Sequence, residues 1–189
     1  YVLIPPFTET PLIFVTIQKP LSFTVAPNRV PARQAIAIIT GGSACGLFYG
    51  MQTLRQMTQQ EGCCLPYTNI QDKPQIEHRG FIICDQRPDS DHGLSEKLVD
   101  RMAAYKLNQL QLYMEHNFIY KISEVWRDDT PLTPEDILEL DAYCRKRHIE
   151  LIPSIACFGH LYKVLRTRTY CHLCELPDME QEPFGFVDR

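Results

Sequence analysis

From residue 79 onwards, strand-like and helix-like segments alternate along the chain, and this alternation constrains the fold more than any other feature. Residues 81–84 form a short, fully apolar run of the kind found in buried parallel strands. The segments that follow are, in order, a helix at 94–106, a strand at 108–115, a helix at 134–147 and a strand at 149–155. Repeated βα units with right-handed crossovers predict a parallel sheet, either open or closed into a barrel.

Both predicted helices of this part carry local signals. The first is expected to bury the face that carries Leu94, Leu98, Met102 and Tyr105. The second has a defined start, because Thr133 can cap the free N–H groups and Pro134 fits the first turn. Residues 108–115 alternate apolar and polar side chains, which predicts a strand with two different faces.

The first part of the chain predicts a smaller α/β layer. Residues 11–18 and 35–40 are short β-branched runs that predict strands. Residues 45–60 predict an amphipathic helix whose apolar stripe lies on a sheet; the stripe consists of Leu47, Met51, Leu54 and Met57. A polar linker is expected at 69–78.

Three parallel strands, as predicted for the second part of the chain, are too few to close an eight-stranded barrel of roughly 250 residues, so either the sheet is open or the chain stops partway.

Composition excludes several classes of partner. A formal net charge of −4 over 189 residues argues against nucleic acid and anionic membrane, which call for clustered Lys and Arg. No apolar run approaches the roughly 20 residues of a membrane helix, and the first residues lack the pattern of a signal peptide. A reduced cytoplasmic protein is therefore favoured. The eight cysteines fit that expectation, because Cys84 and Cys157 lie in apolar runs.

Polar residues follow each of the three predicted strands of the second part. Ligands bind at the carboxyl ends of strands in α/β sheets and barrels. The candidates are Arg87 after the first strand, Glu115 and His116 after the second, and His160 after the third. These side chains suit hydrogen bonding to sugar hydroxyls or acid–base chemistry.

Each candidate also has a structural alternative. Arg87 could form an ordinary ion pair, Glu115 and His116 could be structural, and His160 could be a buried histidine that is satisfied by the backbone. The long connection at 117–132 carries Tyr120 and Trp126, which suit stacking on sugar rings or core packing. A zinc site built from His116, His160, Cys171 and Cys174 is a further hypothesis, and we expect no cofactor.

Five segments resemble, in order, parts of the β-N-acetylhexosaminidases of glycoside hydrolase family 20. They are 46–54 (GLFYGMQTL), 78–81 (HRGF), 102–108 (MAAYKLN), 132–137 (LTPEDI) and 152–160, which ends in Phe-Gly-His. The resemblance implies an α/β fold with two parts. Residues 1–75 would form a small N-terminal α/β sandwich domain, and residues 76–189 the first βα units of an incomplete TIM barrel.

The resemblance also implies a function, the removal of terminal β-linked N-acetylhexosamine from glycans. In this family the substrate's own acetamido oxygen attacks the anomeric carbon, and an Asp-Glu pair at the end of strand four serves the reaction. That pair is expected beyond this chain, which would therefore be an inactive fragment with no catalytic residue of its own. Arg87 matches the family arginine that holds hydroxyls of the terminal sugar, and His160 matches a histidine that lines the active site.

Several positions depart from the family pattern. An acidic pair usually follows strand two, but this chain has His116 and Asn117 there, with Glu115 just before. The alternative function is a non-catalytic carbohydrate-binding or scaffold module. Self-association is also expected, because a truncated barrel exposes apolar strand edges.

Overall fold

The computed structural model describes residues 13–18, 29–31, 36–62, 64–84, 92–114, 117–121, 131–155 and 159–175. The chain divides into two compact units. The first consists of Tyr1–Gly80, Leu98–Asn108 and Arg147–Ile149, and the second of Phe81–Lys97, Gln109–Lys146 and Glu150–Arg189. Strands and helices occur in both units, so the predicted α/β class is confirmed. No helix among the described ranges is long and apolar enough to cross a membrane.

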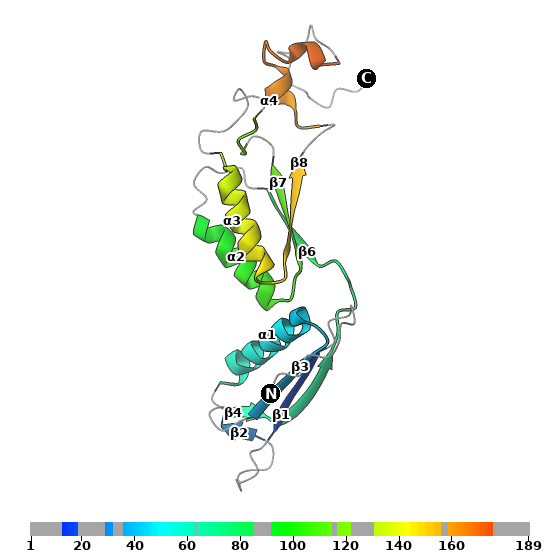
Figure 1. Ribbon diagram of the computed structural model, residues 1–189, viewed down its shortest axis with the longest axis vertical. Helices are drawn as coiled ribbons and strands as arrows, with labels where there is room; N and C mark the ends of the chain where they lie inside the picture. The colour runs from blue at the N-terminus through cyan, green and yellow to red at the C-terminus, as the bar shows by residue number, and fades with distance from the viewer. Residues whose placement is uncertain are drawn as a thin grey trace. The chain divides into compact units, whose positions relative to one another are not determined.

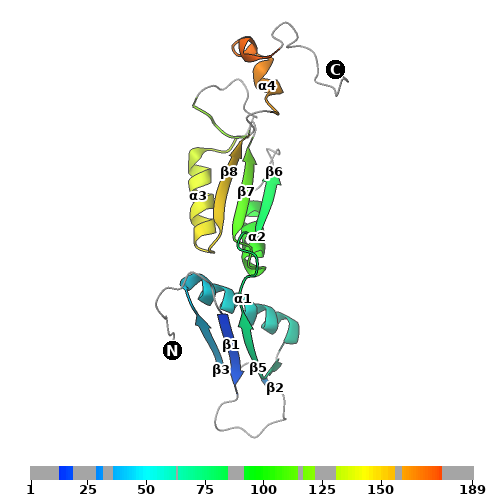
Figure 2. The same cartoon turned by 90° about the vertical axis from the view of Figure 1, so that its right-hand side faces the viewer.

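The first unit contains a three-stranded antiparallel sheet covered by one helix (Figure 2). The strands are β1 (Ile13–Gln18), β3 (Ile36–Gly41) and β5 (Thr68–Asp72), in the order β3-β1-β5, and the helix is α1 (Ala44–Glu61). Two short strands, β2 (Arg29–Pro31) and β4 (Cys64–Pro66), pair separately. The core between sheet and helix is made by Ile13, Val15 and Tyr49. Burial raises the pKa of Tyr49 to about 12.

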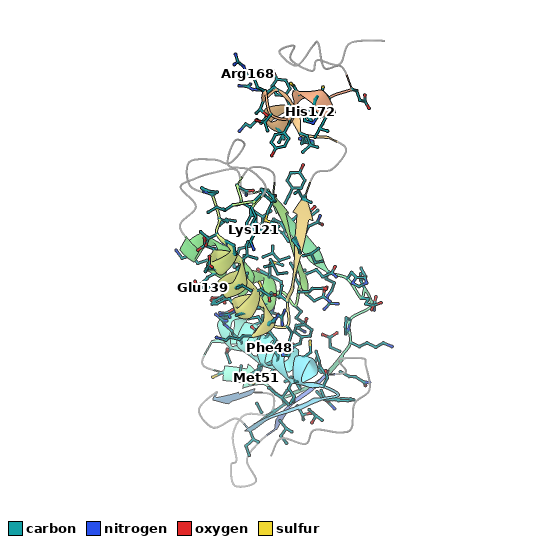
Figure 3. All side chains as sticks on the ribbon, turned by 45° about the horizontal axis from the view of Figure 1, so that its top comes forward. Phe48, Met51, Lys121, Glu139, Arg168 and His172 are labelled. Atoms are coloured by element: carbon teal, nitrogen blue, oxygen red, sulfur yellow. The ribbon has the colours of Figure 1, made fainter. Side chains whose placement is uncertain are left out.

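Helix α1 confirms the predicted helix at 45–60 but turns a different face to the sheet. Its residues buried there are Gly46, Tyr49 and Gly50, whereas Met51 is 54% exposed (Figure 3). Leu54 and Met57 do pack inside, against Leu65. The predicted stripe was therefore wrong at Met51. Small residues were the missed signal, since glycines let a helix backbone approach a sheet closely.

The polar linker expected at 69–78 begins later than predicted. Residues 68–72 form β5, which pairs antiparallel with β1, and Val15 lies opposite Ile70. Asn69 and Gln71 are exposed, while Ile70 between them packs against the core. Its pairing partner lies more than 50 residues away in sequence, which a local pattern does not reveal.

We expect Gly41→Ala to lower the free energy of unfolding of the first unit by about 2 kcal/mol. A Cβ atom at Gly41 would lie 2.5 Å from the backbone nitrogen of Leu47 and 2.8 Å from the carbonyl carbon of Gly46. Backbone atoms at the start of α1 cannot rotate away as a side chain can. Chemical denaturation followed by circular dichroism measures the change.

Gly159→Ala is the matched control for this prediction. A Cβ at Gly159 would meet nothing within 4 Å, so we expect a change below about 0.5 kcal/mol. Equal unfolding midpoints for the two variants would show that the start of α1 does not press on Gly41.

The second sheet consists of β6 (Gly80–Cys84), β7 (Gln109–Met114) and β8 (Glu150–Ile155), in that order. Strands β7 and β8 pair in parallel, as predicted, and the arrows of all three strands point the same way in Figure 2. The connecting helices are α2 (His92–Ala104) and α3 (Pro134–Arg145); α3 packs against β8 (Figure 1). A short helix α4 (Tyr162–Leu165) and a 3-10 turn η2 (Cys171–Leu173) follow.

Helix α3 starts as the sequence predicts. The Thr133 side chain accepts a hydrogen bond from the Asp136 amide, and the Asp136 carboxylate accepts one from the Thr133 amide. This reciprocal pair satisfies two amides that have no partner inside the helix.

Strand β7 has two chemically different faces. Leu110, Leu112 and Met114 are buried, while Gln109, Gln111 and Tyr113 alternate with them and are half-buried. The side-chain amide of Gln109 donates a hydrogen bond to the Glu150 carboxylate across the β7–β8 pair (3.0 Å). The predicted alternation is confirmed.

Two predictions about apolar side chains in this part were wrong. Tyr105 was placed on the buried face of the helix at 94–106, but it follows the end of α2 and is 75% exposed. The buried residues of α2 are Val99, Met102 and Ala103. Phe81 and Ile82 of β6 were expected inside, yet both are exposed, since within the described part of the chain β6 lies at the edge of the sheet.

Candidate active site

The carboxyl ends of β7 and β8 meet at one edge of the second sheet. Their parallel register places Tyr113 opposite Ser154 and Met114 opposite Ile155, so the residues that follow the two strands start from neighbouring points. Of the predicted site residues, His160 lies in the described part of the chain. Arg87, Glu115 and His116 lie outside the described residues, so the distances among the four candidates stay untested.

His160 is exposed and lies in the turn between β8 and α4. The alternative of a buried histidine satisfied by the backbone is therefore wrong. Its ring contacts the ring of Tyr113 in an edge-to-face arrangement, with 6.2 Å between centroids and 84° between planes. Tyr113 was not among the residues that the sequence analysis selected. Its signal was present, because it is the last outward position of the alternating strand.

The backbone of His160 adopts the left-handed conformation, with φ at 59°. Two other non-glycine residues share it, Lys106 at 60° and His148 at 57°. These two lie just past the ends of α2 and α3, where a left-handed residue is a normal way to end a helix. His160 follows a strand instead. Backbone strain of this kind clusters at functional sites.

The start of the long connection after β7 has structure of its own. Phe118 forms a parallel bridge with Leu132, and the rings of Phe118 and Tyr120 meet edge to face with centroids 5.1 Å apart. Burial raises the pKa of Tyr120. Trp126 lies outside the described residues, so both interpretations of it remain untested.

The zinc hypothesis gains no support from the described ranges. They hold no group of three or more His, Cys, Asp or Glu side chains placed to bind a metal ion. The five cysteines with described side chains, Cys45, Cys64, Cys144, Cys171 and Cys174, are free thiols. The Cys171 thiol lies 3.6 Å from the carbonyl oxygen of Arg168, and His172 beside it is exposed (Figure 3).

A polar groove of about 420 Å³ lies in the first unit, between α1 and the second half of α2. Its lining includes Gln52, Arg55, Gln59 and Arg101. His160, the predicted site residue in the described part of the chain, is not among the residues that line it. We place the candidate site at the strand-end edge of the second sheet.

Comparison with known proteins identifies relatives that are similar to this chain in sequence. Residues 29–73 match glycosyl hydrolase family 20, domain 2. The β-hexosaminidase of Akkermansia muciniphila is 32% identical over 148 residues, which cover 66% of this chain and 30% of that protein. The chain belongs to glycoside hydrolase family 20. The β-hexosaminidase of Porphyromonas gingivalis is 29% identical over 163 residues, covering 70% of this chain and 20% of that protein.

Solved structures of family 20 enzymes share the fold. The crystal structure of a β-N-acetylhexosaminidase matches with a TM-score of 0.65 and 28% identity, covering 85% of this chain and 36% of that chain. A mutant Streptomyces plicatus β-hexosaminidase in complex with GlcNAc matches with a TM-score of 0.64 and 22% identity, over 87% of this chain and 35% of that one. The chain thus spans about a third or less of the length of these family 20 proteins.

Proposed function

We propose that this chain is part of an enzyme that removes terminal β-linked N-acetylhexosamine from glycans. The reaction would be a retaining hydrolysis assisted by the substrate's acetamido group. Family membership supports this proposal, and the matched relatives are named as β-hexosaminidases. No observation favours the alternative of a non-catalytic binding module.

In this proposal the chain supplies side chains that hold the sugar. Arg87, Glu115, His116 and His160 would line the strand-end edge, and the Asp-Glu pair would lie outside residues 1–189. The single observation that carries the assignment is His160, an exposed histidine kept in a left-handed backbone conformation beside an aromatic ring. Glycine adopts that conformation without the steric cost, so a histidine there has a reason other than stability.

The division into domains belongs to the same proposal. Residues 1–75 would form the N-terminal α/β domain and residues 76–189 the first part of the catalytic barrel. The family match at 29–73 falls within the first of these ranges, which supports the boundary.

His160→Gly tests the site. We expect it to weaken binding of N-acetylglucosamine about tenfold, the loss of about 1.4 kcal/mol, while raising the free energy of unfolding by about 1 kcal/mol through relief of strain. Ligand-observed NMR measures the first effect and chemical denaturation the second. His172→Gly, at an exposed histidine of η2, is the control and should leave binding unchanged.

Unchanged affinity in His160→Gly would remove His160 from the site.

A turnover assay tests the proposal that the Asp-Glu pair lies outside this chain. An aryl N-acetylglucosaminide should not be hydrolysed by residues 1–189 alone, and efficient hydrolysis by this chain would contradict the placement of the Asp-Glu pair outside it.

Self-association of the 189-residue chain is the last part of the proposal. Phe81, Ile82 and Ile155 are exposed on the two outer strands of the described sheet. Exposed apolar side chains on strand edges favour pairing with another chain. Sedimentation velocity should show larger species as the concentration rises, and a monomer at every concentration would contradict this part.

A further inference from the structure

We infer that Tyr113 is a positioning residue, whose ring holds the imidazole of His160 in the orientation that meets a sugar at the ends of β7 and β8. The inference rests on the proposed function, which gives that orientation a purpose. It adds to the site a residue on the strand itself.

The ring geometry supports a defined contact. A separation of 6.2 Å between centroids and an angle of 84° between planes lie in the range where the positive edge of one ring attracts the electron-rich face of the other. The contact joins residues 47 positions apart in sequence. It therefore depends on the β7–β8 pairing and not on the local chain.

Tyr113 lies at a place suited to act as a support. Its neighbours along β7, Leu112 and Met114, are 4% and 8% exposed, so the backbone that carries the tyrosine is fixed by core packing. Across the sheet it lies opposite Ser154 of β8. A site residue is held more accurately by a packed strand than by a loop.

His160, in contrast, lies on an exposed turn. A Cβ added at Gly159, the residue before it, would meet nothing within 4 Å. An exposed side chain samples several staggered rotamers, and fixing one of them on binding costs affinity. A ring contact that selects one rotamer beforehand removes part of that cost.

The direct test is NMR on the 189-residue chain with labelled histidine and tyrosine. Nuclear Overhauser effects between ring protons of Tyr113 and His160 are expected in the unmodified protein. They need no variant, so they test the contact even if a substitution prevents folding. Their absence, with both sets of ring signals assigned, would overturn the inference.

The variant series tests the consequence for binding. Tyr113→Phe keeps the ring and should keep both the His160 ring shifts and the affinity for N-acetylglucosamine. Tyr113→Leu removes the ring, so we expect changed His160 ring shifts and an affinity about fivefold lower. Tyr105→Leu, which replaces an exposed tyrosine of the other unit, is the control and should change neither.

These results separate this inference from the proposed function. If N-acetylglucosamine does not bind the unmodified chain, the proposed role of His160 fails, while the ring signals still decide whether Tyr113 orients it. If the sugar binds and Tyr113→Leu changes neither the His160 signals nor the affinity, the proposed function stands and the positioning role is overturned.

Discussion

Replacing Arg79 with methionine is expected to lower the free energy of unfolding of the first unit by about 3 kcal/mol. The guanidinium of Arg79 donates to the carbonyl oxygens of Lys106 (2.9 Å), Ile76 (2.6 Å) and Glu77 (3.0 Å). It also lies over the buried ring of Tyr49, 5.8 Å from the centroid. Methionine keeps much of the volume but removes the donor to the Lys106 and Ile76 carbonyls, whereas the Glu77 carbonyl keeps the Asn108 side-chain amide as a donor (2.8 Å). Urea denaturation monitored by circular dichroism measures the loss.

Two further variants make this result specific. Arg55→Met makes the same chemical change at an exposed position of α1, and we expect a change below about 0.5 kcal/mol. Arg79→Lys should be little more stable than Arg79→Met, because a single ammonium group cannot reach the carbonyl groups that lie on different sides of the planar guanidinium. If lysine restores full stability, charge alone explains Arg79 and the hydrogen-bond account is wrong.

A second large effect is expected from Leu110→Ala in β7, which should lower the free energy of unfolding of the second unit by about 3 kcal/mol. Leu110 is 0% exposed. Removing its side-chain atoms leaves a cavity that a strand bonded to neighbours on both sides, β6 and β8, closes only in part. Hydrogen exchange of β7 amides measures the loss for this unit separately from the first one.

The adjacent residue provides the control. Gln111→Ala shortens a half-buried side chain on the opposite face of the same strand, and we expect a change of no more than about 0.5 kcal/mol. Equal losses for the two variants would mean that both faces of β7 are packed equally, which would contradict the alternation of buried and half-buried side chains along the strand.

Elements that carry their own local signal could be predicted from the sequence. Thr133 and Asp136 form the reciprocal cap that residues of their type at that spacing favour. The alternation along β7 and the parallel pairing of β7 with β8 were predicted correctly as well. Neighbouring residues decide the cap and the alternation, so a short stretch of sequence is sufficient for these two. The parallel pairing follows instead from the repeated βα units.

Features that depend on distant neighbours could not be predicted. Met51 and Tyr105 fit an apolar helical stripe, yet both are exposed, because the sheet contacts another face of α1 and α2 ends before Tyr105. Strand β5 is stabilised by its pairing with β1, far away in sequence. Arg79 was taken only as the start of a strand, since its hydrogen-bond partner at Lys106 is 27 residues away.

The candidate site rests on a rule about strand ends and not on any property of the residues alone, and it stays a prediction. That rule selected His160, which lies on an exposed turn with φ at 59°, and it did not select Tyr113 because it considers only residues that follow a strand. A residue at the last outward position of a strand faces the same edge. Extending the rule by that one position would have included Tyr113.

The two faces of β7 also affect how this part of the protein can change in evolution. Leu110, Leu112 and Met114 are constrained by packing, whereas the positions between them contribute little to the core. Substitutions at Gln111 and Tyr113 can therefore accumulate without loss of the fold. A strand built in this way can change the chemistry of one face through its alternate residues, while the packed face that fixes the scaffold stays the same.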